Sequence, residues 1–229
     1  MTATADPPAI DEFVRSHLLL RRFVGVVGIL LPFVLVFFHF GWGRLTGTLP
    51  PTTTLWDSLQ SSLSAYYYTD AGTIFVGSLV AFGVFLVTYR YGRWENRVSD
   101  VAGVCAVLVG LCPTTPDAPT PVQHAVGIVH LVAAMLFFAG MAVFCLFLFP
   151  RDPDRPLAQN TVPPRRARFF RICGVVVVVC IVWALVVFFA LDDATQEATR
   201  YLLWPESVAV ITFALAWLVK GRELVESAV

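Results

Sequence analysis

Six polar side chains are candidates for binding a ligand in a sequence that is otherwise strongly apolar. They are Ser64, Tyr68, Asp70, Asp117, His130 and Glu206. Hydroxyl, imidazole and carboxylate groups can together hydrogen-bond the polar head of a lipid or of a small amphiphile. Imidazole and carboxylate groups are also zinc ligands, although no spacing among these residues demands a metal ion. We therefore predict a ligand site without a metal and without a cofactor.

Two of these residues are expected within the membrane. Glu206 lies about 20 Å from the end of its apolar run at Val219, at a helical rise of about 1.5 Å per residue. An ionisable group at that depth is costly and must pair with a neighbour inside the bundle. His130, at the edge of an earlier apolar run, is the expected partner. The pair could be a buried structural hydrogen bond or part of a site for a headgroup or a metal, and both interpretations stay open.

The sequence lacks the usual signatures of membrane hydrolases. His124 and His130 are six residues apart, so a helix does not present them as an i, i+4 zinc pair, and no H-E-x-x-H motif occurs. Ser64 and His130 could be members of a Ser–His–acid triad, but no G-x-S-x-G nucleophile elbow surrounds Ser64. The residues therefore favour a protein without enzymatic activity.

The composition places these side chains in a membrane. Of the 229 residues, 57% are hydrophobic and 14% are charged, whereas a soluble domain carries about 25% charged residues. A bilayer core of about 30 Å requires roughly 20 apolar helical residues, and six segments approach that length. They are Phe23–Phe40, Thr73–Tyr89, Val98–Cys112, Val122–Phe149, Phe169–Leu191 and Leu202–Val219. The predicted fold class is therefore all-α, a polytopic transmembrane bundle of six helices.

The basic residues predict how the bundle is oriented. If the six segments cross in alternation, one side holds all but two of the 16 Lys and Arg residues, and only Arg44 and Arg200 lie on the other. The positive-inside rule then places both termini in the cytoplasm. We expect a multi-pass protein of the cell membrane, with a cytoplasmic segment at 1–22, a transmembrane domain at 23–221 and a short cytoplasmic tail at 222–229.

The two predicted faces differ in composition. Arg165, Arg166 and Arg168 precede the fifth segment, and we interpret them as a topology signal that also attracts anionic lipid. Aromatic residues collect on the opposite face, where they are typical of an interfacial belt. They could also form a wall against a lipid head or acyl chain. These aromatic residues are Trp42, Trp56, Trp204 and Tyr66–Tyr68.

Small residues predict how two of the helices pack. They recur every four residues on the second and third segments, as Gly77 and Ala81 and as Ala102, Ala106 and Gly110. Such stripes let helix backbones approach closely inside a membrane. We therefore expect the second and third helices to pack tightly, and we expect Pro32 to kink the first helix.

Several motifs resemble a family of uncharacterised bacterial membrane proteins with six helices. The motifs are S-L-S-A-Y-Y-Y-T-D-A-G-T-I-F-V-G at 62–77, C-P-T-T-P at 112–116 and W-P-E-S-V-A-V-I-T-F-A-L-A-W-L-V-K-G at 204–221. Together they cover most of the chain. Because that family is described only as a domain of unknown function, the resemblance implies an architecture and no agreed activity.

Ser64 also resembles the Ser of the ceramidase and progestin-receptor superfamily of membrane zinc hydrolases. Relatives with that arrangement often carry a His where this chain has Tyr68, and an Arg-Asp pair where it has Gly72 and Thr73. The last segment carries no H-x-x-x-H motif. The resemblance therefore implies a hydrolase whose metal ligands are missing from this chain.

Three functions follow from these observations. The first is a non-enzymatic membrane protein with an outer-leaflet polar and aromatic pocket for a lipid or small amphiphile. The second is a metal-dependent lipid hydrolase, inactive in this chain. The third is a small-molecule transporter, which the scarcity of charge in the helix centres and the absence of repeats disfavour. The expected partners are membrane lipids and no nucleic acid, and a homo-oligomer stays open.

Overall fold

The computed structural model consists of helices joined by short segments. It describes residues 7–88, 90, 92–116, 118–151, 162–191, 195 and 199–226, without the side chains of 7–18, 20 and 222–226. Its helices are α1 (Pro7–Thr46), the 3-10 helix η1 (Ser64–Tyr68), α2 (Gly72–Thr88), α3 (Arg93–Leu111), α4 (Pro121–Val143), the π-helix η2 (Phe144–Leu148), α5 (Pro164–Ala190) and α7 (Leu203–Glu226). The described residues form no strand, and the all-α prediction with its six long helices is confirmed.

Four of these helices are long and apolar enough to cross a membrane, and they indicate a membrane protein. These candidate spans are Arg21–Thr46, Pro121–Leu148, Pro164–Ala190 and Leu203–Gly221. α2 is shorter, with 17 residues. α3 carries Arg93, Glu95, Arg97 and Asp100 in its first two turns. The sequence predicts six spanning helices, whereas four helices in the described part of the chain are long and apolar enough to span a membrane.

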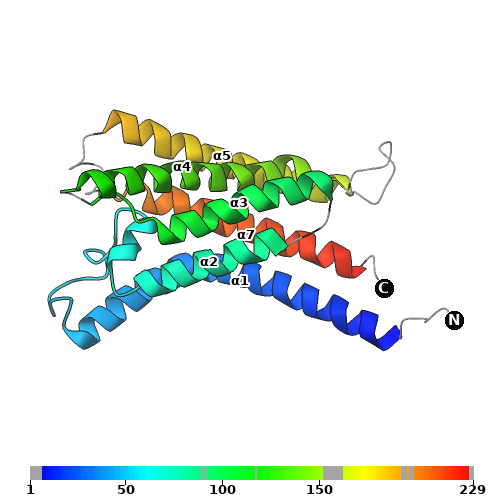
Figure 1. Cartoon of the computed structure of the whole chain (residues 1–229), viewed down its shortest axis with the longest axis horizontal. Coiled ribbons are helices and arrows are strands. Elements are labelled where there is room, and N and C mark those ends of the chain that lie inside the picture. The colour runs from blue at the N-terminus through cyan, green and yellow to red at the C-terminus, as the bar shows by residue number, and fades with distance from the viewer. Residues whose placement is uncertain are drawn as a thin grey trace.

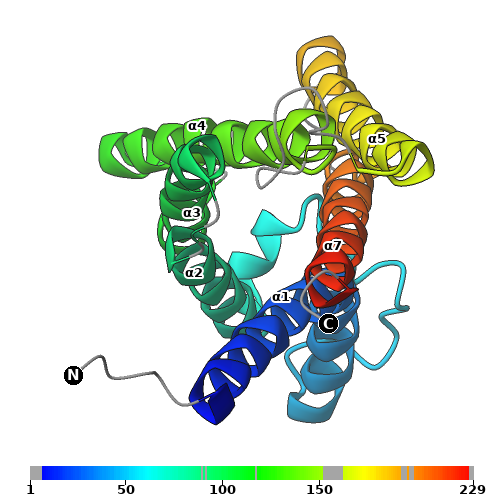
Figure 2. The ribbon, with the colours of Figure 1, turned by 90° about the vertical axis from the view of Figure 1, so that its right-hand side faces the viewer.

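The six long helices form a closed ring, seen along its axis in Figure 2. Each packs against the next in the order α1, α2, α3, α4, α5 and α7, and α7 returns to α1. Both termini lie at one end of the bundle, which we call the terminal end, and η1 lies at the opposite, far end (Figure 1). The alternating direction of the six segments is confirmed, whereas the assignment of the terminal end to the cytoplasm stays a prediction.

α1 is much longer than its apolar run. It begins at Pro7, where proline suits the first turn of a helix, and it extends 40 residues to Thr46. The helix continues through Pro32 and changes direction near its middle (Figure 1). The bend matches the kink expected from a proline inside a helix, which removes one backbone hydrogen bond.

Aromatic side chains fill the centre of the ring. Trp217 of α7 is fully buried. The centroid of its ring lies 5.7 to 6.1 Å from those of Phe85, Phe144, Phe149 and Phe213. The π-helix η2 contributes to this cluster, because its i to i+5 hydrogen bond brings Phe144 and Phe149 to the same face. The centre is therefore packed by rings from α2, α7 and the end of α4.

α2 and α3 pack closely, as predicted, and Gly110 of the predicted stripe lies in this contact, where an added Cβ atom would be 3.1 Å from the Cβ atom of Leu79. The closest approach, however, is between two glycines that the sequence did not single out. A Cβ atom added to Gly83 would lie 2.5 Å from the carbonyl oxygen of Gly103, and one added to Gly103 would lie 2.7 Å from that of Gly83. Gly77, which the sequence singled out, has open space around its Cα atom. A helix carries small residues on several faces, and only the fold decides which face meets its neighbour.

Replacing Gly103 with Ala should lower the free energy of unfolding by about 1 to 3 kcal/mol, the usual cost of overpacking. The new methyl group would collide with the Gly83 backbone, which can move only if the helices separate. The measurement is equilibrium unfolding of the purified protein in detergent. Gly77→Ala is the matched control, and it should be neutral or slightly stabilising. Equal stabilities of the two variants would contradict the packing described here.

Candidate functional site

The far end of the bundle is occupied by residues 61–70, which we call the plug. It contains η1, and Figure 2 shows this helix lying between the helices of the ring. Tyr66 at its centre is fully buried, and Leu63 and Ser64 are buried as well. The plug therefore fills the end of the ring, where its polar backbone groups need partners inside the protein.

Glu206, in the first turn of α7, holds the start of the plug. Its Oε2 atom accepts a hydrogen bond from the backbone N–H of Leu63, with an N···O distance of 2.7 Å. The first N–H groups of a helix have no acceptor within the helix, and a negative charge there is favourable. The N–H of Leu203 also donates to the carbonyl of Ser61, at 2.9 Å, so α7 and the plug are joined at two points.

The expected pair of His130 and Glu206 is wrong. The Nδ1 atom of His130 lies 2.6 Å from the carbonyl oxygen of Cys112, the residue that follows α3. Because a carbonyl oxygen only accepts, Nδ1 carries the proton in this contact. The last carbonyls of a helix lack donors within the helix. Each of the two side chains therefore satisfies the backbone at the end of another helix, His130 at α3 and Glu206 at η1.

Asp70 connects the end of the plug to α1. Its Oδ2 atom accepts a hydrogen bond from the hydroxyl of Thr48, at 2.9 Å, and lies 3.7 Å from Nδ1 of His39. His39 is buried, and its ring meets the ring of Tyr66 edge-on at 5.9 Å. His39 belongs to none of the sequence motifs described above. An ionisable residue inside an apolar run was the signal that could have identified it.

Tyr68 lies at the edge of the plug and reaches the turn after α3. Its hydroxyl donates to the carbonyl oxygen of Thr114, at 2.6 Å, while about half of the residue is exposed. Burial raises the pKa of Tyr68, with a smaller contribution from Tyr67, and burial also raises the pKa of Tyr66. Both phenols thus remain protonated at neutral pH. Asp117, a further candidate, lies outside the described residues.

The loop before the plug is fastened to the start of α7. The guanidinium group of Arg200 donates to the carbonyl of Trp56, at 2.8 Å, and lies over its ring. Trp56 also stacks on Trp204, with the ring centroids 6.0 Å apart. Within the loop, the side-chain hydrogen bond from Thr54 lowers the pKa of Asp57. These contacts position the two exposed indole rings side by side.

The structure places the candidate residues at three separate points and does not bring them to one ligand. Ser64 and Glu206 lie at the start of the plug, and Tyr68 and Asp70 lie at its end. His130 lies at the junction of α3 and α4. Among the described residues, no three His, Cys, Asp or Glu side chains are placed to hold a metal ion. The observed contacts fasten segments together, and a ligand-binding role of these residues stays a prediction.

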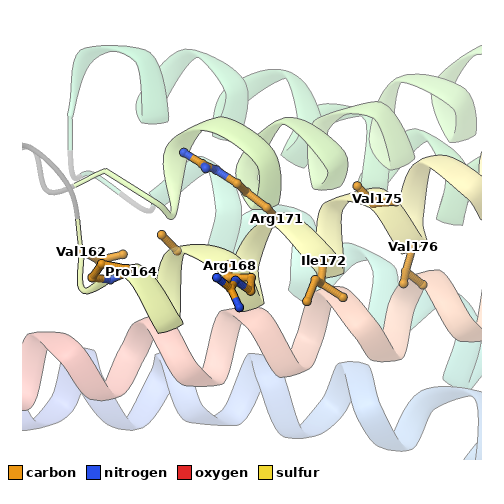
Figure 3. A pocket seen from close by; sticks show the side chains of 8 residues that line it. Val162, Pro164, Arg168, Arg171, Ile172, Val175 and Val176 are labelled. Atoms are coloured by element: carbon orange, nitrogen blue, oxygen red, sulfur yellow. The ribbon is translucent and has the colours of Figure 1, made fainter.

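A crevice of about 570 Å³ opens instead on α5. Its lining consists of Val162, Pro164, Ala167, Arg168, Arg171, Ile172, Val175 and Val176. Apart from the first, these residues belong to α5, and their spacing of three and four places them on one face of the helix. In Figure 3, Arg168, Ile172 and Val176 follow one another along that face. The lining is thus basic near the terminal end and apolar farther along the helix.

The two basic residues of the crevice are open to binding. Arg168 and Arg171 are exposed, and no ion pair involves either of them within the part of the chain that the structure describes. From the sequence, Arg168 is expected only as part of a topology signal, and Arg171 has no separate predicted role. The available signal was a pair of helical rows, 168/172/176 and 171/175, in which an Arg precedes branched apolar residues.

Replacing Glu206 with Ala should loosen the plug. The buried N–H group of Leu63 would lose its acceptor, which costs about 1 to 3 kcal/mol and corresponds to roughly 5- to 150-fold faster amide exchange. Hydrogen exchange followed by mass spectrometry measures this change. Glu206→Gln keeps a carbonyl acceptor, so it should accelerate amide exchange less than Glu206→Ala does. The control is Ser207→Ala, because that hydroxyl bonds only within α7, to Leu203. Unchanged exchange in the Glu206→Ala variant would contradict the assigned role.

The comparisons with known proteins identify a family but no activity. The model of the family described as "Protein of unknown function (DUF998)" matches residues 45–221. The matched region includes the plug, Glu206 and the α5 crevice. No curated protein and no solved structure matches the chain. The expected membership of an uncharacterised family is confirmed, while bacterial origin and kinship with the ceramidase-type hydrolases stay predictions. The chain belongs to the DUF998 family of proteins of unknown function.

Proposed function

We propose that this membrane protein binds a membrane lipid in the α5 crevice and does not act as an enzyme. The observation that supports this proposal is the order of side chains along the crevice, from Arg168 and Arg171 to Ile172 and Val175. A lipid presents its groups in the same order, a polar head followed by an acyl chain. The volume of about 570 Å³ also lies within the roughly 300 to 1,000 Å³ of typical ligand pockets.

The position of α5 favours lipid as the occupant. Only 17% of the apolar stretch that makes α5 a candidate span is buried inside the protein, against 39% to 44% for the other three candidate spans. Its exposed side chains include Ile172 and Val175, in the crevice, and Val179 beyond it. Branched apolar side chains at membrane depth contact acyl chains through dispersion forces. The crevice would therefore be filled from the surrounding bilayer, without an entrance through the bundle.

The contacts at the far end support a protein without catalytic activity. Glu206 and His130 are each engaged by backbone groups, and the Ser64 hydroxyl lies 3.3 Å from that of Ser62. A nucleophilic serine needs a neighbouring base, and these contacts give Ser64 none. An amphiphile in an outer-leaflet pocket at this end would have to displace the plug. From the distribution of the basic residues we further propose that the protein lies in the cell membrane and that its terminal end faces the cytoplasm.

Replacing Val175 with Trp should fill the crevice and expel its lipid. Val175 lines the crevice and is 55% exposed, so the indole ring can be accommodated without disturbing the core. The lipid that remains bound after mild detergent extraction is counted by native mass spectrometry. We expect the wild-type protein to retain lipid and the variant to retain several-fold less.

Val186→Trp is the matched control for this experiment. Val186 is 58% exposed on the same helix but does not line the crevice, so its replacement should leave the retained lipid unchanged. A wild-type protein that retains no lipid would contradict the proposal. Equal retention by the wild-type protein and the Val175→Trp variant would contradict it as well.

A further inference from the structure

We propose that the lipid in the crevice is anionic and that the guanidinium groups of Arg168 and Arg171 bind its phosphate. This inference rests on the proposed function, since it names the class of lipid that the same crevice would take. Three features carry it, namely the depth of the two arginines, the charge around them and the geometry of their side chains.

The depth of the arginines matches the level of lipid phosphates. α5 has 27 residues and is about 40 Å long, whereas the hydrocarbon core of a bilayer measures about 30 Å. About 20 helical residues cross this thickness, and counting that many residues back from Ala190 ends at Arg171. Arg171 therefore lies at the edge of the hydrocarbon. Arg168 lies one turn nearer the headgroups, and Ile172 and Val175 lie in the hydrocarbon. A phosphate held by the two arginines would leave its acyl chain along the apolar rows.

The charge near the crevice favours an anion over a zwitterion. α5 carries four Arg residues in its first eight positions and no Asp or Glu along its length. Lys220 of α7 is buried nearby, where its Nζ atom donates to the carbonyl of Arg151 and lies 6.0 Å from the centroid of the Phe170 ring. The positive headgroup of a choline lipid would be repelled by these charges. A lipid whose headgroup carries net negative charge is attracted by all of them.

The two arginines start from neighbouring positions on α5 and extend to different sides of the helix (Figure 3), so that both long side chains must turn toward a phosphate bound between them. Residues three apart on a helix are neighbours, with about 5 to 6 Å between their Cβ atoms. The planar guanidinium group presents parallel N–H donors that match two oxygens of a phosphate. Along α5, Arg168 is followed at intervals of four residues by Ile172 and Val176, and Arg171 is followed in the same way by Val175. Both rows therefore lead from the phosphate level to apolar side chains.

The test offers the purified protein phosphatidylglycerol and phosphatidylcholine in equal amounts with identical acyl chains. Native mass spectrometry of the detergent-solubilised protein then reports which lipid is retained. Each arginine should contribute about fivefold in affinity for the anionic lipid. The wild-type protein should therefore prefer phosphatidylglycerol by about 10- to 30-fold. The double variant Arg168→Gln and Arg171→Gln should still retain lipid, because its apolar lining is intact, but should lose most of the preference. Arg168→Lys with Arg171→Lys should keep a reduced preference.

The control removes the same charge elsewhere at the terminal end. Arg93 and Arg165 are exposed and do not line the crevice, so Arg93→Gln with Arg165→Gln should keep most of the preference. Excess inorganic phosphate should not displace the lipid, and displacement would overturn the inference in favour of a site for free anions. Equal retention of both lipids by the wild-type protein would also overturn it. If Val175→Trp still expelled lipid in that case, the proposed function would stand.

Discussion

Non-helical backbone at membrane depth needs hydrogen-bond partners within the protein, because lipid offers none. At the far end of the bundle this requirement is met by the carboxylate of Glu206, which accepts the N–H of Leu63 at 2.7 Å. The contact joins the start of the plug to the first turn of α7. His130 meets the same requirement at the end of α3, through the carbonyl of Cys112. Both buried polar side chains thus serve the backbone of segments distant in sequence.

The same packing leaves one helix largely uncovered. Gly83 and Gly103 bring α2 and α3 together, and the rings around Trp217 draw α2, α7 and the end of α4 to the centre. α5 joins this ring through its contacts with α4 and α7 and presents its remaining surface outward. The crevice lies at that surface, where Val162 and Ala167 at its base belong to the core while Arg168, Arg171, Ile172 and Val175 are exposed. The polar residues that fasten the far end therefore differ from those that line the α5 crevice.

The sequence predicted individual residues of the site better than it predicted their partners. The cost of a charge in lipid correctly places Glu206 inside the bundle, but its partner, Leu63, is 143 residues away and contributes a backbone N–H, which has no signature in a sequence. His39 lies in an apolar run, which marks it as a residue that needs a partner, but its partners Asp70 and Tyr66 lie in another segment and no spacing links them to it. Arg168 was noticed for its charge, while the crevice beside it depends on the uncovered face of α5.

The sequence by itself determined the six long helices, the apolar character of the four candidate spans and the common end of the two termini. Each of these properties is local, because it follows from the length of an apolar run or from the loop in which a basic residue lies. The tertiary structure alone decided that Gly83 meets Gly103 and that Glu206 holds the plug. It also decided that the crevice lies beside Arg168 and Arg171. These features depend on the rotation of each helix about its axis, and many rotations satisfy the same apolar run until all six helices pack against one another.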